Sequence, residues 1–177
     1  MAVLNVHSRR IPLSVKEAGA LLDTLASDDD RVWPTDHWPR MRLDRPLAVG
    51  AVGGHGPVRY RVEQYVPGRW VRFRFTGPRG FDGFHEFTVE GDDDSAVLAH
   101  LLIVEPHGPA RLTWPLFFRW MHDAVAEDAL DRVERDLTGT VREPARWSRY
   151  VRLLRAGKRR FARPNAVRTP VAVTGAS

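Results

Sequence analysis

The chain has 177 residues, of which 43% are hydrophobic and 28% are charged, a composition typical of a globular domain. Its apolar runs fall far short of the roughly 18 residues that a membrane-spanning helix needs, and its first residues lack the basic start and long apolar core of a secretory signal. The sequence has no cysteine, which excludes disulfides, thiolate metal sites and a cysteine nucleophile. We therefore expect a cytoplasmic protein.

Charge is unevenly distributed along the chain. Residues 1–138 hold 17 Lys and Arg against 21 Asp and Glu, whereas residues 139–177 hold 10 basic residues and a single acid, Glu143. The net charge of +5 therefore comes from the tail. This asymmetry favours an anionic surface or a protein partner for the tail, and it does not favour a nucleic-acid-binding core.

The first 57 residues predict a strand, a short helix and a loop. Residues 2–11 are rich in β-forming side chains and end at Pro12, as an opening strand would. Ser14 and Glu17 have capping-box spacing for a helix start. The helix then shows an apolar face at helical spacing, formed by Ala18, Leu21, Leu22 and Leu25. Frequent Pro and Gly predict a loop for residues 32–57, with one short strand at about residues 40–45.

A β-hairpin is predicted for residues 58–75, with its turn at Pro67 and Gly68. Apolar residues alternate with arginines in both strands, so one face of the hairpin is predicted to be buried and the other exposed to solvent. The predicted register sets Val62 opposite Phe73, and Tyr60 opposite Phe75. On the other face it sets two further pairs opposite each other: Glu63 with Arg72, and Tyr65 with Trp70.

Two more strands, at about residues 81–90 and 96–105, precede the longest predicted helix, at residues 114–137, which ends at Gly139. An apolar stripe on this helix should face the sheet and extends back through His122 and Arg119: Ala126, Ala129, Leu130, Val133 and Leu137. The opposite side carries a second apolar group that needs another cover: Phe117, Trp120, Met121 and Ala124. Ion pairs at i, i+4 spacing are predicted for Asp128–Arg132, Asp131–Arg135 and Arg132–Asp136.

The basic tail, residues 139–177, predicts a short amphipathic helix at about residues 144–157 and a disordered end. One stripe of this helix is apolar: Trp147, Tyr150, Val151 and Leu154. Because so short a helix is marginal in water, it needs a surface. We predict that its apolar stripe packs on the aromatic side of the long helix, in the same chain or a second copy, with the arginines outward and available to anionic lipid. The alternative is a helix that lies on an anionic membrane. Nucleic acid is not expected as a partner, because no feature of the tail indicates recognition of bases.

Four short motifs resemble bacterial members of the START-related SRPBCC superfamily, in particular its polyketide cyclase/dehydrase-like branch. They are Phe81-Asp82-Gly83-Phe84-His85, Val97-Leu98-Ala99-His100, Arg111-Leu112-Thr113-Trp114 and Met121-His122-Asp123. The resemblance covers residues 1–138. It implies an α+β helix-grip fold, a twisted antiparallel sheet wrapped around a long C-terminal helix. It also implies an apolar cavity that binds lipids, polyketides, hormones or other hydrophobic molecules.

The candidate ligand-binding residues are those predicted to face the cavity: Tyr60, Val62, Phe73, Phe75, His85, Phe87, His100, Arg119, His122 and Ala126. His85 is either a hydrogen-bonded core histidine or a polar anchor among apolar groups. For His100, a structural role is preferred to a functional one. For Arg119, contact with an anionic group competes with the simpler reading that its side chain reaches solvent.

Catalytic, metal and cofactor sites are not indicated. None of the seven histidines pair at His-x3-His spacing, and no Gly-x-Ser-x-Gly elbow is present. Residues 50–56 are glycine-rich without the Gly-Lys-Ser/Thr of a phosphate loop, so they predict a flexible rim loop. We assign no catalytic residue, no metal ligand and no cofactor.

Three functions follow in order of preference. The first is a non-enzymatic binder or carrier of a small hydrophobic molecule. The alternative is an aromatase/cyclase-like enzyme acting on a polyketide, in which His85, Arg119 or His122 would polarise a carbonyl group. The third is a module that acts at a membrane surface or on a protein partner, including a second copy of the chain.

Overall fold

The computed structural model describes residues 1–161, and the side chains of residues 1–157. Residues 1–146 form one compact unit, and a second unit begins at Trp147. The first unit extends beyond the predicted boundary at residue 138. The reason is that the chain after the long helix bonds back to it, with the Arg142 amide donating to Glu134 and the Ala145 amide to Asp131.

In the first unit, the described residues form one seven-stranded antiparallel sheet with the strand order β1-β7-β6-β5-β4-β3-β2. The strands are β1 (Val3–Ile11), β2 (Arg42–Leu43), β3 (Val52–His55), β4 (Val58–Val66), β5 (Trp70–Gly77), β6 (Phe81–Gly91) and β7 (Ala96–Pro106). The sheet does not close, so β1 and β2 are its edges.

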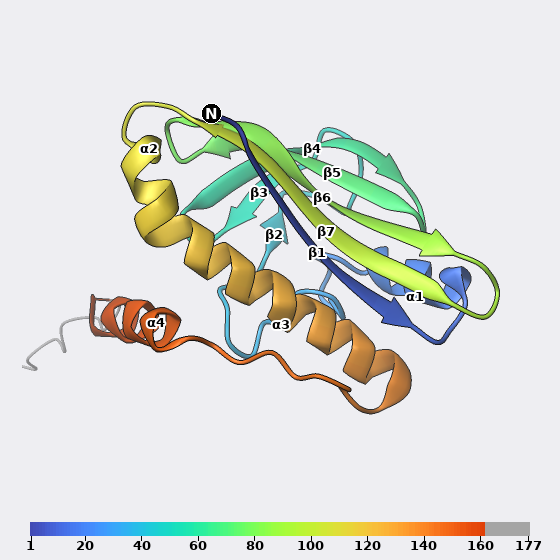
Figure 1. Ribbon diagram of the computed structural model, residues 1–177. Coiled ribbons are helices and arrows are strands. Elements are labelled where there is room, and N and C mark those ends of the chain that lie inside the picture. The colour runs from blue at the N-terminus through green and yellow to red at the C-terminus, as the bar shows by residue number, and fades with distance from the viewer. Residues whose placement is uncertain (162–177) are drawn as a thin grey trace, which may run out of the picture. The chain divides into compact units, whose positions relative to one another are not determined.

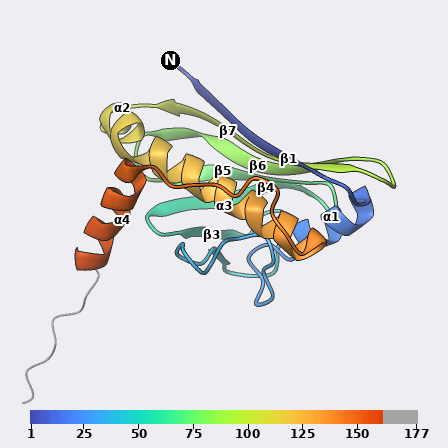
Figure 2. The same cartoon turned by 60° about the horizontal axis from the view of Figure 1, so that its bottom comes forward.

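The helices of this unit lie on one side of the sheet (Figures 1 and 2). They are α1 (Val15–Leu22), α2 (Ala110–Thr113), a π-helical turn (Trp114–Phe118) and α3 (Arg119–Thr138). A long helix against a twisted antiparallel sheet, with a short helix after the first strand, is the helix-grip arrangement. The predicted α+β helix-grip fold is therefore confirmed.

The hairpin of β4 and β5 confirms one predicted face and corrects the other. Tyr60 pairs with Phe75 and Val62 pairs with Phe73, as the alternation predicted. A β-bulge then shifts the register between Val62 and Gln64. The predicted pairs on the other face are therefore wrong, and the observed pairs are Gln64 with Arg72, Tyr65 with Val71 and Val66 with Trp70. A bulge adds one residue to one strand, which alternation alone does not reveal.

The helix ends follow the sequence signals. Ser14 caps α1 in a complete capping box with Glu17, and Gly139 ends α3 in the left-handed conformation, with φ of 78°. The long helix starts earlier than predicted, at Ala110, and includes a π-helical turn that contains Pro115. Because proline has no N–H to donate, the regular hydrogen-bond ladder is interrupted at this point.

Two of the predicted ion pairs along α3, Asp131–Arg135 and Arg132–Asp136, are replaced by contacts to other segments. Asp131 pairs with Arg9 of β1 at 2.8 Å, and Asp136 pairs with Arg31. Arg132 donates to the Asp30 carbonyl at 2.8 Å. The strand and loop that flank α3 thus supply partners that compete with the helix's own side chains.

The segment between α1 and β4 is more ordered than predicted. Six of its apolar side chains are buried: Leu25, Val32, Trp33, Trp38, Met41 and Ala51. The glycine-rich stretch forms β3 rather than a flexible rim loop, because its glycines allow close strand contact. A Cβ on Gly53 would lie 1.9 Å from the Arg42 carbonyl oxygen.

The second unit contains α4 (Arg149–Phe161), which begins and ends later than the predicted 144–157. Ser148 explains the later start, because its hydroxyl accepts a hydrogen bond from the Val151 amide at 3.2 Å. Gly157, predicted to stop the helix, lies within it. The predicted disordered end covers residues that lie outside the described part of the chain. Within residues 1–161, no helix has the length and hydropathy needed to span a membrane.

Candidate functional site

One face of the sheet carries the aromatic residues that alternation placed there. Six predicted site residues are buried on it: Tyr60, Val62, Phe73, Phe75, His85 and Phe87. The His85 ring stacks on Phe73 and Phe75 at centroid distances of 5.0 and 5.2 Å, and the Tyr60 ring meets it edge-on at 5.0 Å. The structure thus gathers these predicted residues around His85.

Two histidines form a buried pair at the centre of this face. Nδ1 of His85 on β6 lies 3.3 Å from Nε2 of His100 on β7, and both side chains are 3% exposed. Burial lowers the pKa of each imidazole well below its usual value, so both rings are neutral. The other ring nitrogens, His85 Nε2 and His100 Nδ1, are buried and have no hydrogen-bond partner among the described residues.

The tautomers of this pair are linked. Each neutral imidazole carries one proton, and one proton must lie between His85 Nδ1 and His100 Nε2 for them to form a hydrogen bond. If His85 donates, its Nε2 is an acceptor and His100 Nδ1 is a donor; if His100 donates, the two roles are exchanged. In either case the pair presents one hydrogen-bond donor and one acceptor to its surroundings.

Of the three predicted residues of α3, His122 lies beside the histidine pair, Ala126 is buried in the helix, and Arg119 lies outside. The His122 ring lies 5.0 Å from the His100 ring, and Ala126 is buried. Burial lowers the pKa of His122 as well. Arg119, in contrast, is exposed, and its guanidinium lies 5.7 Å from the Trp120 ring centre. The simpler interpretation, that the Arg119 side chain reaches solvent, is therefore correct.

His55 belongs to the same row of rings but was not predicted. Its Nδ1 lies 3.2 Å from the Tyr60 hydroxyl, and its ring lies 4.4 Å from the Trp33 ring. Burial raises the pKa of Tyr60 well above its usual value, so the phenol stays protonated. In the sequence His55 lies in a glycine-rich stretch without alternation, so no pattern indicates to which side of the sheet its side chain points.

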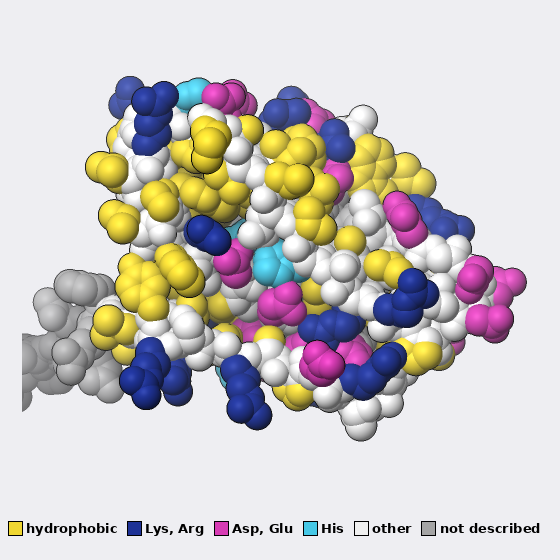
Figure 3. All heavy atoms as spheres, viewed as in Figure 1, with side chains coloured by type: hydrophobic (Ala, Val, Ile, Leu, Met, Phe, Trp, Pro, Cys, Tyr) yellow, Lys and Arg dark blue, Asp and Glu magenta, His cyan; other side chains and the backbone are white. Residues whose placement is uncertain are grey.

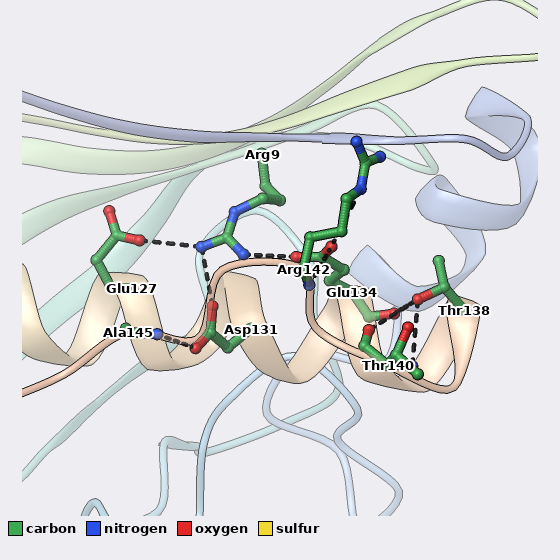
Figure 4. Close-up of polar contacts among 8 residues, drawn as sticks. All are labelled: Arg9, Glu127, Asp131, Glu134, Thr138, Thr140, Arg142 and Ala145. Carbon is green, nitrogen blue, oxygen red and sulfur yellow. Dashed lines mark hydrogen bonds and ion pairs between the residues drawn. The ribbon is translucent and has the colours of Figure 1, made fainter.

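A polar seam joins the sheet edge to the long helix, and the sequence analysis missed it. Asn5, His7 and Arg9 alternate along β1 and point at acids of α3. Asn5 donates to Asp123 at 2.9 Å, and His7 Nδ1 lies 2.6 Å from Glu127. Figure 4 shows Arg9 reaching three acids of α3, namely Glu127, Asp131 and Glu134.

The seam shifts the pKa values of its members. Contacts with Asp123 and Glu127 raise the pKa of His7 to about 9. Burial alone would raise the pKa of Asp123, but the His122 and His7 contacts outweigh it and hold this pKa below its usual range. A regular signal for the seam existed, because Asp123, Glu127 and Asp131 recur every four residues on one side of the helix.

Known structures support the fold. The chain is similar to CalU16 from Micromonospora echinospora, with 12% identity, a TM-score of 0.56, and coverage of 89% of this chain and 84% of that one. It is also similar to truncated norcoclaurine synthase from Thalictrum flavum, with 11% identity, a TM-score of 0.59, and coverage of 78% and 94%. A third similar structure is StfQ, a di-domain ARO/CYC of the steffimycin biosynthetic pathway, with 12% identity and a TM-score of 0.60. The match covers 78% of this chain and 51% of StfQ.

At these identities the similarity establishes the fold alone. All three structures share the helix-grip fold with this chain, so the fold implied by the short sequence motifs is confirmed. No protein-family profile and no curated protein sequence matches the chain.

Proposed function

We propose that the protein binds a small, flat, largely apolar molecule between the inner face of the sheet and α3. The molecule would carry one hydrogen-bond acceptor and one donor, such as a carbonyl and a hydroxyl group. The observation that carries the proposal is the His85–His100 pair, whose outer nitrogens are buried without partners among the described residues. A buried polar atom that lacks a partner costs free energy, and a ligand group that pairs with it recovers this cost.

The surroundings of the pair support an aromatic ligand. Phe73, Phe75 and Tyr60 present ring faces and edges around His85, and aromatic groups favour such offset and edge contacts. Many apolar side chains with a few converging polar groups are typical of small-molecule sites. The cavity that would hold the molecule remains a prediction, which the binding experiment below tests.

Native mass spectrometry of freshly purified protein is the first experiment, because a retained molecule would reveal its mass. Two naphthalene probes then test the pair directly. We expect 6-hydroxy-2-acetonaphthone, whose hydroxyl and carbonyl groups are too far apart to bond to each other, to bind at least about tenfold more tightly than 2-ethylnaphthalene, which has neither.

Substitutions identify the residues responsible. His85→Leu and His100→Leu should each remove the preference for the polar probe while keeping the binding of the apolar probe. His107→Gln is the matched control, because His107 is an exposed histidine outside the pair. Failure of both probes to bind, or an unchanged preference in both leucine variants, would show the proposal to be wrong.

A second function, catalysis of proton transfer next to a carbonyl group, is supported by the linked tautomers. In one of them His85 Nε2 is a neutral base, while His100 Nδ1–H can donate to a carbonyl oxygen. StfQ, an ARO/CYC by its name, has the same fold. Deuterium incorporation into the methyl group of 2-acetylnaphthalene in D2O tests this function. Wild-type protein should accelerate the exchange and His85→Leu should not, whereas equal rates would leave binding as the function.

A further inference from the structure

Three donor atoms meet where β1 passes along α3, outside the His85–His100 pair. One comes from each of His7, His122 and Asp123, and all lie within 4.8 Å of one another. Asp123 Oδ1 lies 3.5 Å from His7 Nε2 and 3.6 Å from His122 Nδ1. These distances exceed those of good hydrogen bonds and lie within the range of ion pairs.

The two separations from Asp123 are close to those between ligands of one metal ion. Zinc bonds to histidine nitrogen and carboxylate oxygen at about 2.0–2.1 Å, which places two ligand atoms of a tetrahedral site about 3.3–3.4 Å apart. The observed 3.5 and 3.6 Å are within a few tenths of an ångström of this spacing. Small side-chain shifts would therefore bring three protein ligands to bonding distance of one ion.

The neighbours of these atoms hold them in the orientation that a metal ligand needs. His7 Nδ1 lies 2.6 Å from the Glu127 carboxylate, so its N–H donates there, and Nε2 becomes a ligand when the bound metal ion displaces its proton. Metal-binding histidines commonly donate their second ring nitrogen to a carboxylate in this way. Asn5 donates to Asp123 Oδ1 at 2.9 Å and fixes that carboxylate.

Two of the three donors lack a competing partner. His7 Nε2 and His122 Nδ1 are buried and have no hydrogen-bond partner among the described residues. The carboxylates, in contrast, are partly open, because the Asp123 and Glu127 side chains are 33% and 36% exposed. Figure 3 shows histidine and acidic side chains together at the surface between the long helix and the sheet edge. An ion can reach the donors from this side.

Charge also favours a cation here. Four acids of α3 pair with His7 or Arg9 of β1: Asp123, Glu127, Asp131 and Glu134. Among the ion pairs of the described residues, the arginines that contact these acids are Arg9 and Arg142. Negative charge thus exceeds positive charge around His7, and a divalent ion would reduce the excess.

We propose that His7, His122 and Asp123 bind a divalent first-row transition-metal ion, with Glu127 as the residue that positions His7. Two imidazoles and one carboxylate are a donor set that suits zinc and ferrous iron and leaves coordination positions open. Sequence spacing argued against any metal site because it compared histidines that are close in the chain. The fold instead brings His7 of β1 to consecutive residues of α3.

The experiment uses the full chain without a histidine tag, treated with a chelator and then dialysed. Zinc chloride is titrated in by calorimetry, and cobalt binding is followed by visible absorption, because tetrahedral cobalt absorbs strongly. We expect one ion per chain. His122→Ala and Asp123→Asn should each weaken zinc binding by more than about 100-fold, and Glu127→Gln by about 10–100-fold.

His107→Ala is the matched control and should bind zinc as the wild type does, because His107 is exposed and lies outside the cluster. Circular dichroism establishes that each variant folds, and Asp123→Asn preserves the side-chain shape if an alanine variant does not fold. No stoichiometric binding by the wild type, or unchanged binding by Asp123→Asn and His122→Ala, would overturn the proposal. His7 would then be an ion-paired imidazolium.

Discussion

Nδ1 of His85 lies 3.3 Å from Nε2 of His100, across the neighbouring strands β6 and β7. Both imidazoles are buried, and phenylalanine rings pack against each of them. A core that holds two neutral histidines depends on pH, because protonation of either ring would place a charge in an apolar interior. The same pair therefore bears on both the stability and the proposed function of the protein.

We predict that His85 makes the protein less stable in acid. Burial holds the pKa of His85 well below its usual value in the folded state, whereas the unfolded chain takes up a proton below about pH 6.5. Folding stability should thus fall as the pH drops through that value, by about 2 kcal/mol for this one group between pH 7 and pH 5. The groups that face His85 are Tyr60 of β4 and His100 of β7, with His55 and His122 further lowering its pKa through their charge.

His85→Phe should remove this part of the acid sensitivity while keeping a ring at the site. Urea unfolding at pH 7 and pH 5 measures the difference. The exposed-histidine variant His107→Gln should lose as much stability as the wild type. An equal loss in His85→Phe and the wild type would contradict the prediction.

Phe73→Ala tests whether the centre of the inner face is packed. Phe73 is fully buried and contacts the rings of Tyr60 and His85. We expect a loss of about 3–5 kcal/mol in the free energy of unfolding, as for a well-packed core phenylalanine. A markedly smaller loss, measured by urea unfolding, would mean that Phe73 borders open space, as the wall of a binding cavity would.

Gly19→Ala tests the contact between α1 and the β4–β5 turn. A Cβ on Gly19 would lie 2.2 Å from the Gly68 carbonyl oxygen, so the helix or the turn must move. We expect a loss of up to about 3 kcal/mol, although alanine favours a helix by about 1 kcal/mol over glycine. Gly157→Ala is the control in α4, where a Cβ meets nothing within 4 Å. It should leave thermal stability unchanged or raise it.

Sequence patterns predicted the facing of residues wherever one side of a strand was clearly apolar. Phe73 and Phe75 alternate with arginines, so their burial followed from the sequence. The bulge after Val62 did not, because it changes the number of residues rather than their type. In β1, the apolar residues Leu4 and Val6 are exposed, whereas Asn5, His7 and Arg9 face α3.

The seam was hidden for a physical reason. Polar residues in an edge strand normally face water, and here they face acids of a helix more than 100 residues further along the chain. No local pattern reports such a partner. The site therefore divides into a part that periodicity revealed, around His85, and a part that only the tertiary structure revealed, around His7.

The basic helix α4 leads to the last prediction, that it binds anionic membranes. Arg149, Arg152 and Arg155 recur every three residues in this helix, and the Arg155 guanidinium lies 4.3 Å from the Trp147 ring centre. Basic helices with a nearby aromatic residue are typical of interfacial segments, and each basic residue near an anionic surface contributes about 1 kcal/mol. We expect the full chain to sediment with vesicles of phosphatidylcholine and phosphatidylserine, and not with phosphatidylcholine alone.

Replacing Arg149, Arg152 and Arg155 by Glu should abolish this sedimentation and leave the melting temperature unchanged. The control replaces three exposed arginines of the first unit by Glu, which changes the net charge equally: Arg61, Arg69 and Arg79. It should still sediment with the anionic vesicles. If the α4 variant instead keeps binding vesicles, the membrane role is wrong. If it loses thermal stability or changes its oligomeric state in size-exclusion chromatography, then α4 packs on the protein itself, on the aromatic side of the long helix or on a second copy.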